Sequence, residues 1–365
     1  MEYQSVLVFL LGLVLLSLGA EALVRGASRL AATLGISSLI VGLTVVAFGT
    51  SAPEFVVSFQ ASLDGRPDIA LGNVIGSNIF NVLLILGMAA IVSPLVVSDR
   101  IVRHDVPIVI GLSSLVMLLA ADGRIGRVEG VGLVALLVVY ILFLIWIERR
   151  VPRRVEVPDA PGAPSRRRGP RAGIVDALLI LIGLALLVQG SRMLVDSAVE
   201  IARMLGMSEL VIGLTIVAAG TSMPELATSV VASARKEQDI AVGNIVGSNI
   251  FNLLMVLGGA AAIVEGGIPV PAAAYTFDMP VMIAVAIACL PVFFAGLKIS
   301  RWEGGVFVLY YVAYIIFLVL DATDHAAKPV FSLVMLLFVV PLTVLTFSIV
   351  LVRHRASEER APPGS

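Results

Sequence analysis

The chain carries two near-copies of an apolar segment, each with one glutamate directly after a proline. The stretch VVAFGTSAPEFVVSF at residues 45–59 recurs 171 positions later as IVAAGTSMPELATSV at 216–230. A second stretch, GNVIGSNIFN at 72–81, recurs with the same offset as GNIVGSNIFN at 243–252. Residues 42–63 and 213–234 are identical at 13 of 22 positions, and residues 69–87 and 240–258 at 13 of 19. The fold must therefore accommodate two copies of one unit.

The composition places both copies in a membrane. Hydrophobic residues make up 59% of the 365 positions and charged residues 14%, against about half and about a quarter in soluble domains. Eleven apolar spans are expected, each near the roughly 20 residues that a helix needs to cross a bilayer. They cover 4–24, 38–62, 69–93, 105–120, 128–147, 174–195, 209–234, 240–264, 278–296, 303–320 and 330–352.

The number of spans in each copy predicts an inverted repeat. Five is odd, so the second copy enters the membrane from the opposite side, as in many secondary transporters. The expected fold is an all-α polytopic membrane protein with two inverted five-helix repeats, a ten-helix core, and one extra C-terminal transmembrane helix. The predicted boundaries are 1–147 for the first repeat, 148–173 for a linker, 174–320 for the second repeat, and 321–365 for the extra helix and a tail.

The distribution of basic residues predicts the orientation. The linker at 148–173 is rich in proline and contains eight arginines, which favour the cytoplasmic side. Alternation from this loop places 19 of the 25 basic residues inside, the N-terminus outside and the C-terminus in the cytoplasm. The arginine-rich, lysine-poor usage suggests the inner (plasma) membrane of a prokaryote. The small-residue pattern at Ala20 and Ala22 resembles a signal-peptide cleavage site, but no basic segment precedes it.

Glu54 and Glu225 are the most informative single residues. A carboxylate in the middle of a membrane span costs about 2.5–3.5 kcal/mol on insertion scales, and the expected spans place both glutamates about ten residues or more from either end. The alternative is that each pairs with a basic residue, but no Lys or Arg lies at that depth in the matching segments. Pro53 cannot donate a backbone hydrogen bond, so the carbonyl of Gly49 is expected to lose its helical partner. Two anionic side chains beside bent backbone favour a cation between them.

The second motif predicts close packing beside these glutamates. Its glycines are four residues apart, as Gly72 with Gly76 and Gly243 with Gly247, a spacing that permits close helix contact. Its polar residues also share one helix face at i and i+4. These are Ser77 with Asn81, and Ser248 with Asn252. The remaining amides, Asn73, Asn78, Asn244 and Asn249, are interpreted as interhelical hydrogen-bonding or capping residues.

The assembled side chains predict an all-oxygen site. Carboxylates, hydroxyls, amides and main-chain carbonyls suit hard cations, and Ca²⁺ accepts 6–8 oxygens. Soft metals prefer His or Cys, whereas Cys289 stands alone and His104, His325 and His354 lie at helix ends or in tails. A zinc or copper site is not expected, nor an enzyme, because no nucleophile–base pair is present.

At these residues the chain resembles the prokaryotic sodium/calcium exchangers of the calcium/cation antiporter superfamily. GTSAPE with GSNIFN, and GTSMPE with GSNIFN, are similar to the two alpha repeats of that family. The resemblance implies a Ca²⁺ site between Glu54 and Glu225, completed by the carbonyls of Thr50 and Thr221. It also implies flanking Na⁺ sites and alternating access by sliding of the first helix of each repeat, 4–24 and 174–195. No cofactor is implied beyond the transported ions.

The residues of the implied Na⁺ sites form two mirrored sets. One set is Ala47, Thr50, Ser51, Glu54 and Ser248, and the other is Ala218, Thr221, Ser222, Glu225 and Ser77, with Asn81 and Asn252 between them. Some family members carry Asp where this chain has Asn81 or Asn252, which leaves the stoichiometry and any K⁺ dependence open. The segment 330–352 lies beyond the ten-helix core, and its role is open, as is the oligomeric state.

The predicted function is exchange of Na⁺ for Ca²⁺ across the membrane by alternating access. One alternative is an H⁺/Ca²⁺ antiporter in which the same glutamates carry protons. A second alternative, from a different class, is a cation channel, which would conduct without a counter-ion. The lipid bilayer is the expected partner, and nucleic acid is not.

Overall fold

The computed structural model describes residues 2–150, 170–206, 212, 215, 216, 218–294, 297–344 and 348. Nearly all of these residues are helical. Seven helices are long and apolar enough to cross a membrane, and the bent pair Ser38–Thr50 with Ala52–Leu63 makes an eighth span. The chain is therefore a multi-pass, all-α membrane protein, as the composition predicts.

The elements of the first half set the pattern. They are α1 (Glu2–Leu34), α2 (Ser38–Val41), η1 (Gly42–Val46), α3 (Ala47–Thr50), α4 (Ala52–Leu63), α5 (Pro67–Phe80), η2 (Asn81–Leu86), α6 (Gly87–Val92), β1 (Leu95–Val96), η3 (Ile101–Asp105), α7 (Val106–Leu119), η4 (Ala120–Asp122), β2 (Arg124–Ile125) and α8 (Arg127–Arg150). Here η4 is a 3₁₀ turn and the other η elements are π-helical.

The second half repeats this order. Its elements are α9 (Pro170–Met204), α11 (Ala218–Gly220), α12 (Met223–Ala234), α13 (Gln238–Phe251), η6 (Asn252–Leu257), α14 (Gly258–Ile263), β3 (Ile268–Pro269), η7 (Ala274–Asp278), α15 (Met279–Phe294), β4 (Lys298–Ile299) and α16 (Arg301–Ala322). Two further elements follow, α17 (Lys328–Val334) and η8 (Met335–Val339). The two five-helix repeats and the extra C-terminal helix agree with the predicted fold.

The expected count of eleven full-length spans is not reached within the described residues. The helices over Ala274–Leu290 and Lys328–Val344 are apolar but have only 10–17 residues. The expected span 209–234 includes residues outside the described part of the chain. Most of the linker at 148–173 and the tail after 348 also lie outside it. Conversely, α1 and α9 extend well beyond the predicted 4–24 and 174–195. The domain boundaries themselves stay predictions.

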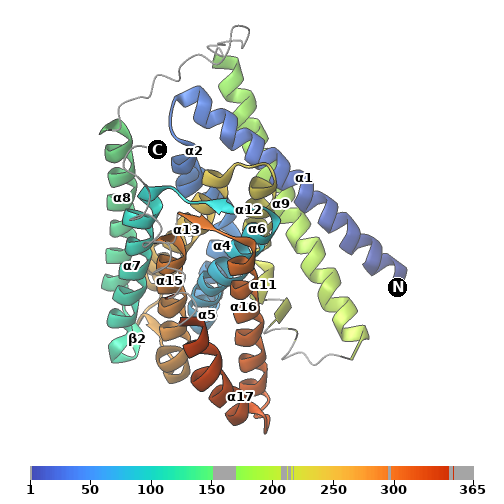
Figure 1. Cartoon of the computed structure of the whole chain (residues 1–365), viewed down its shortest axis with the longest axis vertical. Coiled ribbons are helices and arrows are strands. Elements are labelled where there is room, and N and C mark those ends of the chain that lie inside the picture. The colour runs from blue at the N-terminus through green and yellow to red at the C-terminus, as the bar shows by residue number, and fades with distance from the viewer. Residues whose placement is uncertain are drawn as a thin grey trace, which may run out of the picture.

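The centre of the molecule is formed by α5 and α13 with their π-helical continuations. The most apolar window of Gln238–Ile263 is 94% buried and that of Pro67–Val92 is 78%, against 28% in Ser5–Leu34. Helices α1 and α9 pack along each other and cross one side of the bundle as a long diagonal pair (Figure 1). The repeated polar motifs therefore lie in the buried middle rather than on lipid-facing helices.

Glycines bring the α1 and α9 backbones into direct contact. A Cβ on Gly12 would lie 2.9 Å from the carbonyl oxygen of Gly190, and a Cβ on Gly19 would lie 2.8 Å from that of Gly183. The reverse contacts are equally short, at 2.8 Å for each of Gly183 and Gly190. Because real Cβ atoms do not approach backbone so closely, only glycine permits this seam. The two helices therefore form one tightly joined pair.

Short strands join the two halves at both ends of the bundle. Strand β1 pairs antiparallel with β4, with Leu95 opposite Ile299, and β2 pairs antiparallel with β3, with Ile125 opposite Ile268. Each two-stranded sheet thus takes one strand from each repeat. The halves are interlocked rather than laid side by side as separate domains.

Candidate cation site

The first glutamate motif forms a broken helix rather than a kinked continuous one. Helix α3 ends at Thr50, Ser51 leaves the helical region at φ −80° and ψ 4°, and α4 begins at Ala52. The two segments meet at a bend of 42°. Pro53 lies in the first turn of α4, where a proline costs no hydrogen bond.

This break corrects the expectation that Glu54 lies in mid-helix. It lies in the first turn of α4, where the unpaired N–H groups and the helix dipole favour negative charge. The second copy has the same arrangement, with Ser222 before α12 and Glu225 in its first turn. Sequence hydropathy does not locate the break, because apolar residues flank GTSAPE on both sides and the whole stretch reads as one span. Both carboxylates are still expected deep in the membrane, but the helix N-terminus at each one stabilises its negative charge.

The second motif changes helix type at its last residue. Helix α5 passes into the π-helical η2 at Asn81, and α13 passes into η6 at Asn252. A π-helical turn widens the backbone and is often found at functional sites. Both asparagines are at most 1% exposed. Element η2 packs against α12, and η6 packs against α4, so each asparagine lies on an element that contacts the opposite glutamate helix.

Reciprocal hydrogen bonds connect the two glutamate motifs. The hydroxyl of Ser222 donates to Glu54 Oε1 at 2.8 Å, and the hydroxyl of Ser51 donates to Glu225 Oε1 at 3.1 Å. Each serine therefore holds the carboxylate of the other repeat. Both glutamates are only 1% exposed. The structure brings together the residues that the sequence places 171 positions apart.

Ser77 and Ser248 differ although they are equivalent in sequence. Ser77 Oγ lies 3.0 Å from Ser222 Oγ and extends the bridge to Glu54. Ser248 Oγ is buried and has no hydrogen-bond partner among the described residues. Among the flanking alanines, Ala47 is fully buried, and Ala218 belongs to the short α11, where its side chain lies outside the described part.

The two threonine hydroxyls support the broken helices. Thr50 Oγ1 donates to Asn244 Oδ1 at 2.9 Å, and Thr221 Oγ1 donates to Asn73 Oδ1 at 3.2 Å. Asn73 also donates to the backbone carbonyl of Glu54 at 3.3 Å, and Asn244 to that of Glu225 at 3.5 Å. Both threonine hydroxyls are therefore engaged in hydrogen bonds to the opposite repeat.

The remaining amides are hydrogen-bonding residues, as predicted. Asn81 donates to Asn249 Oδ1 at 3.0 Å, and Asn252 donates to Asn78 Oδ1 at 3.2 Å. The sequence analysis missed Ser58 and Ser229. They accept hydrogen bonds from Asn73 at 2.9 Å and from Asn244 at 3.0 Å. Their identity in both repeats, four residues after each glutamate, was the available signal.

The site contains buried oxygens that no protein donor satisfies. Among the described residues, Glu54 Oε2, Glu225 Oε2, Asn81 Oδ1, Asn252 Oδ1 and Ser248 Oγ are buried and lack a hydrogen-bond partner. A buried acceptor without a partner costs about 1–3 kcal/mol, and a charged one costs more. The amide nitrogens of Asn81 and Asn252 are already engaged, which leaves their oxygens free. Hard cations fit such a set of acceptors.

The two sides of the site differ in packing. A Cβ on Gly243 would lie 3.1 Å from Leu39 O, and a Cβ on Gly247 would lie 2.8 Å from Leu43 O, so α13 packs tightly on the helices before Glu54. The equivalent Gly72 and Gly76 meet nothing within 4 Å in the described residues. Within the described residues, the predicted glycine contact is present at Gly243 and Gly247.

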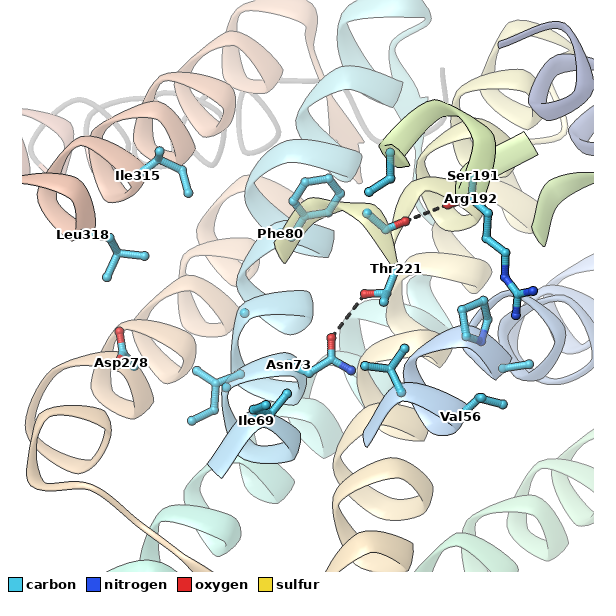
Figure 2. A pocket seen from close by; sticks show the side chains of 18 of the residues that line it. Val56, Ile69, Asn73, Phe80, Ser191, Arg192, Thr221, Asp278, Ile315 and Leu318 are labelled. Carbon is cyan, nitrogen blue, oxygen red and sulfur yellow. Dashed lines mark hydrogen bonds between the residues drawn. The ribbon is translucent and has the colours of Figure 1, made fainter. Parts of the chain in front are cut away.

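A cavity of about 780 Å³ occupies the loosely packed side. Pro53, Gly76, Asn73 and Thr221 line its deep end. Figure 2 shows the Thr221–Asn73 hydrogen bond at its centre, with Asp278 and Leu318 toward one end and Arg192 toward the other. The opposite pair, Thr50 with Asn244, is fully buried. In this structure a path reaches the neighbourhood of the glutamates from one side.

The serines provide the first test of this geometry. Removing the hydroxyl of Ser222 takes one hydrogen bond from Glu54 and leaves Ser77 without its neighbour. A hydrogen bond to a charged group contributes about 1.5–3 kcal/mol. Ser222→Ala is expected to raise the half-saturating concentration of a hard divalent cation about tenfold or more in a binding titration of the purified protein. Ser114→Ala, which removes a hydroxyl that bonds only its own helix, is the control. Unchanged half-saturation in Ser222→Ala would contradict the role of the bridge.

The chain is similar in sequence to known proteins. The family model described as sodium/calcium exchanger protein matches residues 4–146 and 175–320. The inner membrane protein YrbG of Escherichia coli is 41% identical over 280 residues, covering 76% of this chain and 85% of YrbG. The sodium/calcium exchanger MaX1 of Methanosarcina acetivorans is 32% identical over 344 residues, covering 86% and 97%.

Solved structures show the same architecture. The sodium-calcium exchanger NCX_Mj, soaked without Na⁺ and Ca²⁺, superposes with a TM-score of 0.74 at 31% identity. The match covers 87% of this chain and 99% of NCX_Mj. The same protein soaked with 10 mM Na⁺ and 10 mM Sr²⁺ gives a TM-score of 0.73.

Proposed function

Since the chain belongs to the sodium/calcium exchanger family, we propose that it is a secondary active antiporter that exchanges Na⁺ for Ca²⁺, with Ca²⁺ bound between Glu54 and Glu225. The observation that carries this proposal is the set of buried, unpartnered oxygens around the two carboxylates. Two carboxylates neutralise one Ca²⁺, and amide and carbonyl oxygens complete the flexible shell that this ion prefers.

The same charge balance accounts for exchange rather than co-transport. Two Na⁺ ions compensate the two carboxylates as one Ca²⁺ does, so the ions compete for Glu54 and Glu225. With the carboxylates uncompensated, moving the site across the bilayer would carry two buried charges, which is costly. The site therefore changes sides only when occupied, and the Na⁺ gradient drives Ca²⁺ the other way.

The orientation follows from the basic residues. With the N-terminus outside, α9 runs outward, so its residues Ser191 and Arg192 at the cavity lie toward the outer side. The cavity then opens outward, and the buried Thr50–Asn244 pair faces the cytoplasm. The C-terminus is cytoplasmic. The plasma membrane of a prokaryotic cell is the proposed location, in keeping with the description of YrbG as an inner membrane protein.

Flux in proteoliposomes tests the function. Vesicles loaded with Na⁺ are diluted into Na⁺-free buffer that contains labelled Ca²⁺, with pH equal on both sides and K⁺-loaded vesicles as control. We expect Ca²⁺ uptake only with internal Na⁺. Uptake that needs an acid interior instead would replace Na⁺ by H⁺ as the coupling ion. Uptake down its own gradient, without any counter-ion, would indicate a channel.

A further inference from the structure

Three charged positions near one end of the molecule have oppositely charged equivalents near the other end. With the offset of 171, Glu21 corresponds to Arg192, Arg25 to Asp196, and Arg235 to Asp64. The polar motifs of the two repeats are identical, whereas these three positions reverse sign without exception. We call Glu21, Arg25 and Arg235 the inner triad, and Arg192, Asp196 and Asp64 the outer triad.

The inner triad is assembled in this structure. Glu21 on α1 forms ion pairs with Arg25, one turn along the same helix, and with Arg235, the residue that caps the C-terminus of α12. Ser28 adds a second link, because its hydroxyl donates to Glu237 Oε1 at 2.9 Å. The inner end of α1 is thereby fastened to the helix that carries Glu225. Helix α1 packs along α12 as well.

The outer triad is not assembled. Within the described residues, no ion pair connects Arg192 with Asp196 or Asp64. Arg192 and Asp196 line the cavity between α9 and α4, and Figure 2 shows the Arg192 side chain without a hydrogen bond to the other residues drawn. Asp64, at the C-terminal cap of α4, accepts from Gln60 at 3.0 Å and lies 3.9 Å from Arg66.

The glycine seam couples the two triads mechanically. Gly12 and Gly19 of α1 contact Gly190 and Gly183 of α9 through backbone atoms, so the two helices move as one pair. Any displacement of this pair across the bundle changes the Glu21–Arg235 and the Arg192–Asp64 separations together. The two repeats are related by a twofold axis. In the position of the helix pair that closes the cavity, Arg192 therefore meets Asp64, just as Glu21 meets Arg235 in this structure.

We propose that the two triads are alternating ionic latches, the inner one holding the state with the cavity open and the outer one holding the state with the cavity closed. This inference rests on the proposed alternating-access antiport. Reversal of every sign keeps the attraction in both triads. It also leaves two of the three inner charges basic and two of the three outer charges acidic, as the bias of basic residues toward the cytoplasm favours.

The latches are tuned to be reversible. The Arg235 and Glu21 side chains are 38% and 26% exposed, and ion pairs at partly exposed positions contribute little to stability. Such pairs shift a two-state equilibrium several-fold without locking it, whereas a deeply buried pair would trap one state. We therefore expect changes of about two- to tenfold in populations when a latch is removed.

Cross-linking tests the latches independently of transport. The background is Cys289→Ser, which removes the only cysteine of the sequence. Two double-cysteine variants are made in it and treated with a short bifunctional thiol reagent. The outer pair is Asp64→Cys with Arg192→Cys, and the inner pair is Glu21→Cys with Arg235→Cys. Both pairs are expected to cross-link, the outer pair in a minor fraction of molecules. Adding Arg235→Gln should raise the outer yield about two- to tenfold. Arg124→Gln, which removes an exposed arginine that lies 3.7 Å from Asp122, should leave it unchanged.

Charge exchange provides a second readout. Asp64→Arg and Arg192→Asp alone should each slow turnover several-fold, and the double variant should restore it. Three results would each overturn the latch proposal. The outer pair never cross-links, Arg235→Gln does not raise the yield of the outer cross-link, or the double charge-exchange variant turns over no faster than the single variants. Because cross-linking needs no ion flux, a wild-type protein that fails to exchange Na⁺ for Ca²⁺ would count against the proposed function and not against the latches.

Discussion

Replacing either Glu54 or Glu225 with glutamine is expected to abolish Na⁺-dependent Ca²⁺ uptake, with a loss of at least about a hundredfold. Each carboxylate has one oxygen held by a serine and one oxygen without a partner. Glutamine removes half of the site's negative charge and introduces an NH₂ donor that repels a cation. Breaking one partner of a buried charge interaction costs about 3–5 kcal/mol, which exceeds the energy of a hundredfold change.

The same variants should remain folded. In buffer without Na⁺ or Ca²⁺, two buried and uncompensated carboxylates oppose folding, so glutamine should keep or raise the melting temperature. Addition of Ca²⁺ should raise the melting temperature of the wild-type protein, because a ligand that binds only the folded state stabilises it, but not that of the variants. Glu265→Gln, in the exposed loop before β3, is the control. Uptake near the wild-type rate in Glu54→Gln or Glu225→Gln would exclude the assigned site.

Gly247→Ala and Gly76→Ala are expected to differ sharply in stability although they occupy equivalent positions. A Cβ on Gly247 would lie 2.7 Å from Ala47 Cβ and 2.8 Å from Leu43 O, whereas a Cβ on Gly76, which lines the cavity, meets no described residue within 4 Å. Overpacking of this kind costs about 1–3 kcal/mol. Gly247→Ala should lower the melting temperature by several degrees and displace the neighbouring Ser248, which also reduces exchange.

Gly76→Ala is the matched control for that prediction. It adds the same methyl group to the same motif in the other repeat, where the cavity provides room. Its melting temperature should stay close to that of the wild-type protein. Equal destabilisation of the two variants would mean that the packing difference between the repeats is not present in the protein in solution.

Sequence reasoning reached the fold and the two glutamate motifs that meet in it because the signals were local and duplicated. Apolar length identified the spans, the odd number of spans in each copy predicted the inversion, and a repeated carboxylate in hydrocarbon pointed to Glu54 and Glu225. The reciprocal bonds from Ser51 and Ser222 confirm that the two motifs meet. Whether all twelve predicted residues bind ions stays a prediction, since hydrogen bonds alone do not define a coordination shell.

Other features could not be read from the sequence for physical reasons. A proline is compatible with either a kink or a new helix, and only packing around Ser51 decides for the break. The difference between the Thr50–Asn244 and Thr221–Asn73 sides has no counterpart in the motifs, which are the same in both repeats. That difference between the two sides is a property of the conformation in this structure. Motifs with the same polar residues in both repeats do not distinguish one conformation from another.

The strand pairs between the two halves have a consequence for how the protein is made. Leu95 and Val96 of β1 pair only with β4, and β2 pairs only with β3, so neither strand of the first half has a partner until the ribosome has completed most of the second. Unpaired strand edges invite association with other chains. When the two halves are produced as separate chains, we therefore expect either an assembly in which both strand pairs form, β1 with β4 and β2 with β3, or no assembly.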